Sequence, residues 1–196
     1  MGYMVYGCKR FEIQLLKATG SLPAIMSTGW TQITTPQSVG IDLELEAGTR
    51  TTLRGGDDLI GSVRDDDKVV GVNITFQDAE VSGTFIQKMC GGTYEAGSAA
   101  SAEAYTPPLL SAGSSPKFAS RLYVAQYREG SQHESNIYRY KRWTFPNCRG
   151  NLPTFTATDR AFLVPTMMIH GEENLVHSPQ KPVFYWDEVT NAFAEI

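Results

Sequence analysis

The sequence predicts a mainly β domain, a β-sandwich or barrel with one short flanking α-helix and long loops. Short stretches of alternating apolar and polar residues recur along the chain, which is the pattern of half-buried strands. Stretches rich in Gly, Pro, Ser and Asp separate them. One segment has the period of an amphipathic helix. Seven or eight short strands with one helix are typical of a sandwich or barrel, since two β layers can bury a shared core.

The helix is predicted where a strand changes its periodicity. Residues 70–76 alternate as Val, Ile and Phe on one face, and from Asp78 onward the apolar residues fall four apart. Asp78 has the side chain of an N-cap, and Gly91 and Gly92 end the helix. The predicted core stripe of this helix consists of Val81, Phe85 and Met89.

Other strands are predicted from alternation alone. The first covers residues 10–17, and residues 19–40 have the composition of a loop. Residues 117–128 and 136–144 form a predicted hairpin with a turn at Gly130 and Ser131. Residues 146–153 form a turn-rich corner. The remaining predicted strands cover residues 154–158, 162–170 and 182–186.

One predicted strand, residues 41–46, has an acidic face. In this strand apolar residues alternate with acidic ones, so the two sets lie on opposite faces. The apolar set consists of Ile41, Leu43 and Leu45. The second set, the acidic face, consists of Asp42, Glu44 and Glu46. Two long loops follow in the prediction, a polar one at 48–67 and a Gly, Ser, Ala and Pro-rich one at 91–116. A polar connection as long as 48–67 usually has a function, whereas the composition of 91–116 indicates a flexible surface loop.

Composition favours one sizeable domain spanning residues 1–196. The chain has 196 residues with 41% hydrophobic content, enough to bury an independent core. Its formal net charge is −4, so it lacks the basic footprint of a nucleic-acid binder. No uninterrupted apolar run is long enough to span a membrane, and the N-terminus lacks the order of a signal peptide. We therefore expect a soluble protein made in the cytoplasm, with no membrane partner.

The sequence offers no recognisable catalytic or metal motif. Cys8, Cys90 and Cys148 are odd in number and widely spread, which disfavours a disulfide framework or a paired zinc site. The three histidines are at least seven residues apart. There is no phosphate-binding glycine loop, nucleophile elbow or His-Glu-x-x-His helix. We expect neither an enzyme nor a cofactor.

The layout of the chain resembles a known family. A strand turns directly into a short helix ending Gly-Gly, after an acidic strand and a long loop. The helix is followed by a corner reading Lys-Arg-Trp-x-Phe-Pro-x-Cys-x-Gly at residues 141–150. This order resembles the major tail tube protein of long-tailed, siphovirus-like bacteriophages. The similarity extends over most of the chain and is strongest at 69–92 and 140–165.

The resemblance implies a structural virion protein that assembles with itself. Its subunits would form hexameric rings whose strands join into one β-barrel, and the rings would stack into a tail tube. DNA would pass through without specific binding. The further partners implied are tail proteins such as the tape measure and terminators, and the location is the virion tail, after synthesis in the bacterial cytoplasm. No catalytic residue or cofactor is implied.

Two sets of candidate site residues follow. The acidic face would line the lumen, because a passage for DNA should repel phosphate. The loop at 48–67 would be an assembly loop that becomes ordered between stacked rings, with acids meeting basic residues from the 139–149 region of a neighbour. Its candidate residues are Arg54, Asp57, Asp58, Leu59, Ile60, Arg64, Asp65, Asp66 and Asp67.

Charge segregation is compatible with head-to-tail assembly, and other functions stay open. Residues 41–67 hold eight acids and three basic residues, net −5, whereas residues 117–149 hold seven basic residues and two acids, net +5. One alternative is the tube subunit of a contractile tail or injection machine. Another is a β-sandwich carbohydrate- or ligand-binding module with a stacking platform of Tyr138, Tyr140 and Trp143. A third is a hydrolase on a jelly-roll scaffold.

Overall fold

The structure, a computed structural model, confirms a mainly β fold with one short helix. It describes residues 3–22, 29–33, 35–80, 82–98, 101–109, 111, 113, 115–128, 137–155, 159 and 164–190. The elements in chain order are β1 (Tyr3–Leu15), β2 (Thr31–Ile33), β3 (Pro36–Glu46), β4 (Arg50–Gly55), β5 (Asp58–Arg64), β6 (Lys68–Asp78), α1 (Gly83–Cys90), β7 (Thr93–Glu95), β8 (Ala104–Thr106), β9 (Phe118–Arg128), β10 (Ile137–Gly150), β11 (Thr166–Gly171) and β12 (Tyr185–Val189).

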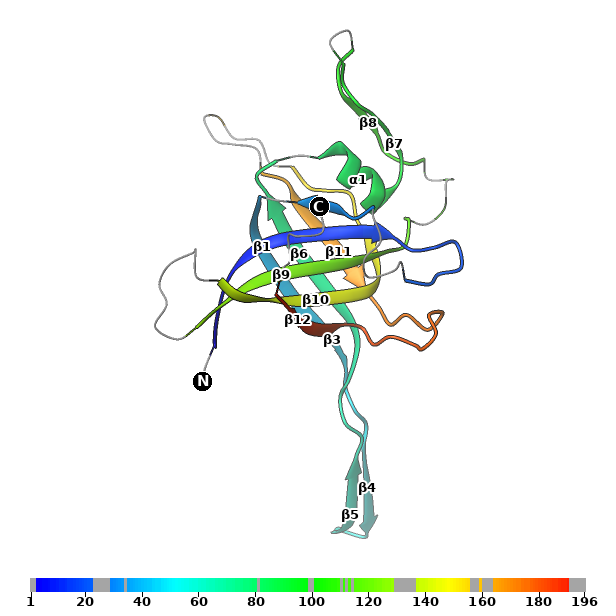
Figure 1. The fold of residues 1–196 in the computed structure, drawn as a ribbon. Coiled ribbons are helices and arrows are strands. Elements are labelled where there is room, and N and C mark those ends of the chain that lie inside the picture. The colour runs from blue at the N-terminus through cyan, green and yellow to red at the C-terminus, as the bar shows by residue number, and fades with distance from the viewer. Residues whose placement is uncertain are drawn as a thin grey trace.

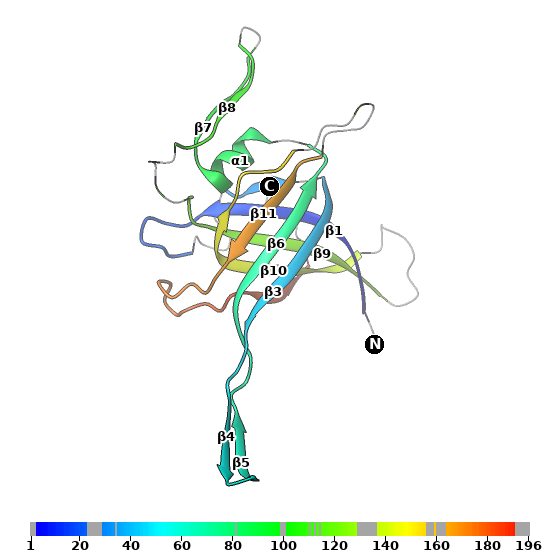
Figure 2. The same ribbon diagram turned by 180° about the vertical axis from the view of Figure 1, so that it is seen from behind.

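The main sheet is antiparallel and folds over itself into a sandwich. It has eight strands in the order β2-β1-β9-β10-β11-β6-β3, with β12 added beside β10. In Figure 1, β1, β9, β10 and β12 form one layer and β11, β6 and β3 cross behind them, as the reverse view in Figure 2 also shows. Strand β10 joins the layers. Its register shifts between Phe145 and Cys148, and beyond that shift its partner changes from β12 to β11.

The core lies between the two layers and beneath α1. The rings of Phe11, Phe76 and Phe85 meet there, with the Phe76 and Phe85 centroids 5.8 Å apart in an edge-to-face arrangement. Of the predicted helix stripe, Phe85 and Met89 are fully buried as expected, and Val81 lies outside the described residues. The helix therefore closes the sandwich with the face that its periodicity predicted.

The predicted helix start was wrong. The N-cap is Ser82, whose hydroxyl accepts a hydrogen bond from the Phe85 N–H at 3.3 Å. Asp78 is instead the last residue of β6, where it is buried and accepts the Thr35 hydroxyl at 2.7 Å. The end was predicted correctly, since Gly91 has φ 84° and its N–H binds the Gln87 carbonyl.

Four further expectations need correction. Strand β1 begins at Tyr3 and not at residue 10. Two register shifts near Gly7 interrupt the alternation of its first half, which is why the pattern did not predict it. Residues 19–40 hold β2 and the start of β3. Strand β10 continues through Pro146 to Gly150, where a corner was predicted. Both long loops contain hairpins, β4–β5 within 48–67 and β7–β8 within 91–116.

The predicted hairpin of residues 117–128 and 136–144 is present as β9 and β10. Its turn at Gly130 and Ser131 lies outside the described residues. None of the helices in the described part of the chain has the length and apolar character of a membrane span.

Candidate functional site

The most distinctive feature outside the sandwich is the β4–β5 hairpin. Strands β3 and β6 pair down to Glu46 and Lys68, and the chain then continues into a separate two-stranded sheet that begins at the Arg50–Arg64 pair. Figures 1 and 2 both show this hairpin projecting away from the sandwich. A two-stranded sheet with no layer against it is marginally stable in water. Such an element gains stability when a partner covers it.

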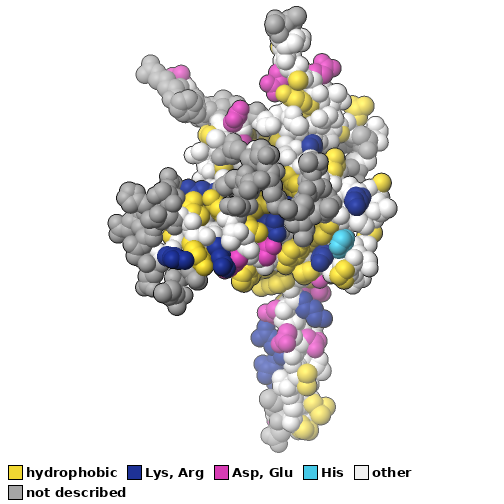
Figure 3. Space-filling model, viewed as in Figure 1, with side chains coloured by type: hydrophobic (Ala, Val, Ile, Leu, Met, Phe, Trp, Pro, Cys, Tyr) yellow, Lys and Arg dark blue, Asp and Glu magenta, His cyan; other side chains and the backbone are white. Residues whose placement is uncertain are grey.

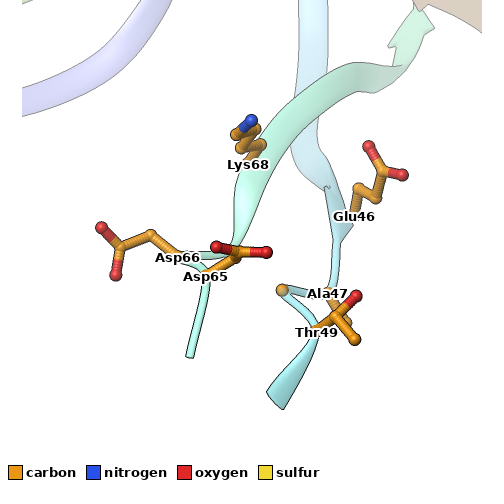
Figure 4. Close-up of a pocket in the computed structure, with 7 residues that line it drawn as sticks. Glu46, Ala47, Thr49, Asp65, Asp66 and Lys68 are labelled. Atoms are coloured by element: carbon orange, nitrogen blue, oxygen red, sulfur yellow. The ribbon is translucent and has the colours of Figure 1, made fainter. Parts of the chain in front are cut away.

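The hairpin joins the sandwich through a narrow neck, residues 47–49 and 65–67. A Cβ on Gly48 would lie 2.5 Å from the carbonyl carbon of Asp65, so only glycine fits where the two segments cross. The Gly48 N–H donates to the Asp67 carboxylate at 2.9 Å, and the Asp65 N–H donates to the Thr49 carbonyl at 3.1 Å. Figure 4 shows the shallow pocket at this neck, lined partly by Glu46, Asp65, Asp66 and Lys68.

The two faces of the hairpin differ in chemistry. Its cationic face carries Arg50, Thr52 and Arg54 from β4 with Ser62 and Arg64 from β5. The opposite face carries Leu53 and Val63, whose side chains are 64% and 71% exposed. Arg50 and Arg64 lie directly opposite each other, which is unfavourable between like charges without an anion nearby. Arg64 has such an anion nearby, because its guanidinium lies 3.3 Å from the Asp67 carboxylate.

Most of the expected assembly residues therefore share this hairpin and its neck. Arg54 and Arg64 lie on the cationic face, Asp57 is in the turn and Ile60 is 66% exposed. The expected residues Asp65, Asp66 and Asp67 belong to the neck. Asp58 and Leu59 begin β5, but their side chains lie outside the described part.

Apolar side chains are also exposed where the hairpin leaves the sandwich. Leu43 and Leu45 of β3 are 45% and 59% exposed, and Val69 of β6 pairs with Leu45. Figure 3 shows hydrophobic side chains on the body just above the projecting stem and again toward the tip of the hairpin. Isolated exposed apolar residues are ordinary, but a row of them along one ribbon indicates an interaction surface.

The acidic face is on the outside of the sandwich, opposite the strand face that meets the core. Ile41 pairs with Ile74 and packs against the core, while Asp42 and Glu46 are exposed to solvent. Glu44 is only half-exposed, because its carboxylate accepts Asn73 Nδ2 at 2.6 Å and His170 Nδ1 lies 3.8 Å away. Asp42 and Glu46 thus carry most of the free negative character of this face.

The basic stretch of residues 117–149 is not a free cationic patch. Arg121 is buried with Glu12 of β1, and Arg139 contacts Glu188 of β12 at 2.9 Å. Arg142 is buried and binds both carboxylate oxygens of Asp187. The expectation of a basic surface there was wrong for the buried Arg121 and Arg142, whereas Arg139 stays partly exposed with its charge paired, because β1 and β12 bring acids from outside the stretch. The anionic neck therefore needs another partner than Arg142.

The acids and bases of the β1–β9–β10 layer form a buried network. Glu12, with 2% of its surface exposed, receives Arg10 at 2.7 Å and the Tyr123 hydroxyl at 2.8 Å as well as Arg121. Burial and the neighbouring carboxylate of Glu12 raise the pKa of Tyr123. Burial alone would lower the pKa of Arg142, but hydrogen bonds to Asp187 and Tyr123 raise it above its usual value. This network connects side chains of four strands, β1, β9, β10 and β12.

The aromatic residues of β10 do not form one platform. Tyr140 and Trp143 lie on opposite faces of the strand, and Trp143 packs on the core beside Phe184, with ring centroids 5.5 Å apart. Tyr138 is held between guanidinium groups, 4.3 Å from Arg128 and 4.8 Å from Arg139. The Lys141 ammonium lies over Trp143, 5.3 Å from its ring centroid, and closer to Trp186 of β12, at 3.8 Å. A flat sugar-binding surface is not assembled from the three residues.

The remaining reactive groups are embedded in the fold. Burial raises the pKa of Cys8 and Cys90 to about 11 and that of Cys148 to about 12. Across the described ranges, no group of three His, Cys, Asp or Glu side chains is arranged to hold a metal ion. His170 has Glu44 and Glu172 nearby, the latter at 3.5 Å.

Comparison with known proteins adds no relative. No family model matches this chain, and no curated protein sequence matches it. The inference of function consequently depends on the geometry of the hairpin, the neck and the strand faces.

Proposed function

We propose that this chain is a structural subunit that assembles with copies of itself into stacked rings, as the tail tube of a long-tailed bacteriophage. The observation that carries the proposal is the β4–β5 hairpin, which extends β3 and β6 beyond the sandwich and exposes Leu53 and Val63 to solvent. A projecting hairpin with exposed apolar side chains is suited to contact a neighbouring subunit.

Open sheet edges support a ring of subunits. Within the described residues, β3 and β12 each pair along one edge only, so the other edge of each offers unpaired backbone groups. Exposed edges invite pairing with another chain, and closure into a shared barrel removes them. Rings of six copies that join their sheets in this way are the assembly we propose. The proposed subunit has no catalytic function and needs no cofactor.

In this assembly the acidic face lines the lumen. DNA carries one negative charge about every 1.7 Å of its axis, so carboxylates such as Asp42 and Glu46 repel it and let it slide. The double variant Asp42→Lys, Glu46→Lys leaves the hydrogen bond from Asn73 to Glu44 in place and tests this orientation. Its tubes should retain DNA at low salt and release it at high salt. If tubes of the variant do not retain DNA at low salt, this face does not line the lumen.

Electron microscopy of purified protein at rising concentration tests the assembly itself. Wild-type protein should form rings and tubes. A variant with residues 51–66 shortened to a Gly-Ser turn should remain folded by circular dichroism, since none of the hairpin side chains that the structure describes belongs to the core, but should not elongate. Wild-type protein that stays monomeric at every concentration, or a shortened variant that still forms long tubes, would refute the proposal.

A further inference from the structure

A second hairpin, which we call the arm, leaves the sandwich at the end opposite the β4–β5 hairpin. It consists of β7 and β8 and is separate from the main sheet. Both views, Figure 1 and Figure 2, place the two hairpins at opposite ends of the molecule. The chain therefore has two projections that point in opposing directions.

The base of the arm is fixed against α1. The Tyr105 hydroxyl donates to the Gly91 carbonyl at 2.8 Å. The Tyr94 ring lies so close to Gly83, at the start of α1, that no Cβ fits between them. Gly92, with φ 87°, brings the chain against the Thr106 carbonyl. The first two contacts anchor the base of the arm to the two ends of α1.

The outer part of the arm is built from small residues. Ser98 and Ser101 form a bridge through two backbone hydrogen bonds, of 2.8 and 3.3 Å. Ala96, Ala102 and Ala104 lie beside this bridge and are exposed, as are the two acids among them, Glu95 and Glu103. The small side chains let a second hairpin approach closely, and a two-stranded sheet gains stability when another layer covers it.

The charges of the arm and of the cationic face are opposite. Glu95 and Glu103 are the only charged residues between 91 and 116. Arg50, Arg54 and Arg64 lie on the cationic face of the β4–β5 hairpin, and the acid of its turn, Asp57, lies beyond them. A hydrogen bond from Tyr94 to Glu103 raises the pKa of Tyr94 and holds that carboxylate on the arm.

We propose that the arm of one subunit receives the β4–β5 hairpin of the next subunit in the stack. The inference rests on the proposed function and names the surface that the hairpin contacts. Because the projections lie at opposite ends, a head-to-tail arrangement brings them side by side, and a head-to-tail contact repeats without limit. The arginines of the cationic face meet Glu95 and Glu103, and these charge pairs set register and association rate.

A charge exchange tests the contact. Arg54→Glu and Glu95→Arg, each alone, place like charges together and should slow tube elongation at least about tenfold at low salt. The double variant, Arg54→Glu with Glu95→Arg, restores opposite charges and should elongate at nearly the wild-type rate. Lys17→Glu changes an exposed cation outside both hairpins and is the matched control, with no expected effect. Single variants that elongate normally, or a double variant that is not rescued, would overturn the inference.

Shortening the arm separates this inference from the proposed function. With residues 96–103 replaced by a two-residue turn, the subunit should keep its unfolding midpoint and form rings that do not stack. If wild-type protein forms no assemblies, the proposed function fails. If wild-type tubes form and the arm-shortened protein elongates equally well, the proposed function survives and the arm is not the receiving surface.

Discussion

Replacing Gly48 with alanine should disable the β4–β5 hairpin while leaving the sandwich intact. The added Cβ would lie 2.5 Å from the carbonyl carbon of Asp65, whereas non-bonded carbon atoms approach to about 3.5 Å. The Cβ would come closer still to the Asp65 carbonyl oxygen, so the two segments of the neck must separate by at least about 1 Å. That movement breaks both the hydrogen bond from the Asp65 N–H to the Thr49 carbonyl, which is 3.1 Å long, and the 2.9 Å hydrogen bond from the Gly48 N–H to Asp67.

The size of the effect follows from those two hydrogen bonds. Each contributes about 1 kcal/mol net, so the closed neck loses about 2 kcal/mol. Since 1.4 kcal/mol is a factor of ten, the local equilibrium shifts toward the open neck by about 30-fold. No core residue lies in the neck, so the free energy of global unfolding should change by less than about 0.5 kcal/mol.

Amide hydrogen exchange and electron microscopy together measure this prediction. In Gly48→Ala the amides of residues 48 and 65 should exchange about 30-fold faster than in the wild type, while the midpoint of urea unfolding stays constant. Tube elongation of this variant should fail. Gly61→Ala is the matched control, because a Cβ there meets no atom within 4 Å. Unchanged exchange in the neck, or normal elongation of Gly48→Ala, would contradict the reasoning.

Three other predictions concern the sandwich. Phe85→Ala should cost about 3–5 kcal/mol in urea denaturation, because it removes a fully buried ring; an unchanged midpoint would exclude the assigned helix face. Glu12→Ala should cost a similar amount, because Arg10 and Arg121 lose their shared carboxylate; a stability equal to wild type would show that the network is not held by this charge. The pKa of Cys148 is about 12 in the folded protein and about 9 in the unfolded chain, so unfolding between these pH values releases its proton. The free energy of unfolding should therefore fall by about 1.4 kcal/mol per pH unit from pH 9 toward 12. In Cys148→Ala, urea denaturation at pH 9–11 should show a smaller decrease of the free energy of unfolding with pH.

Local periodicity was sufficient to predict the fold class and its central elements. The strand at 70–76, the buried positions of Phe85 and Met89, and the pairing of β9 with β10 all follow from residues close together in sequence. Burial of one face imposes a period that a short window reveals. The end of α1 was also predictable, because glycine readily adopts the positive φ found at Gly91.

Contacts across long stretches of sequence account for most of the errors. Asp78 has the side chain of an N-cap, but in the structure its carboxylate accepts a hydrogen bond from Thr35, which is 43 residues away. The basic stretch looked like a surface patch because nothing local indicates that Glu12 and Asp187 neutralise two of its arginines. Bulges in β1 and β10 shift the alternation by one residue and obscure strands that continue through them.

The sequence of the β4–β5 hairpin contained a turn signal that was overlooked because the segment is polar. Gly56 and Asp57 form the two-residue loop of β4–β5, a pair typical of hairpin turns, and Thr51 and Leu53 alternate with Thr52 and Arg54 before it. The segment is polar because it lies outside the core, and polarity favoured an irregular loop. The residues of the candidate site were therefore predictable as a group, but their division between a cationic and an apolar face needed the strand register.

The direct connection of the hairpin through the neck to β6 has a mechanical consequence. Tension on the hairpin tip acts along the strand axis and passes from β6 to β11 through six consecutive residue pairs, from Val72–Gly171 to Gln77–Thr166. Those backbone hydrogen bonds lie across the direction of pull, so they are loaded in shear and must break together instead of unzipping singly. Beyond them, the load reaches β10 through only three pairs, Cys148–Gly171 to Gly150–Ile169. Under force, the junction of β10 and β11 is where the subunit should yield first.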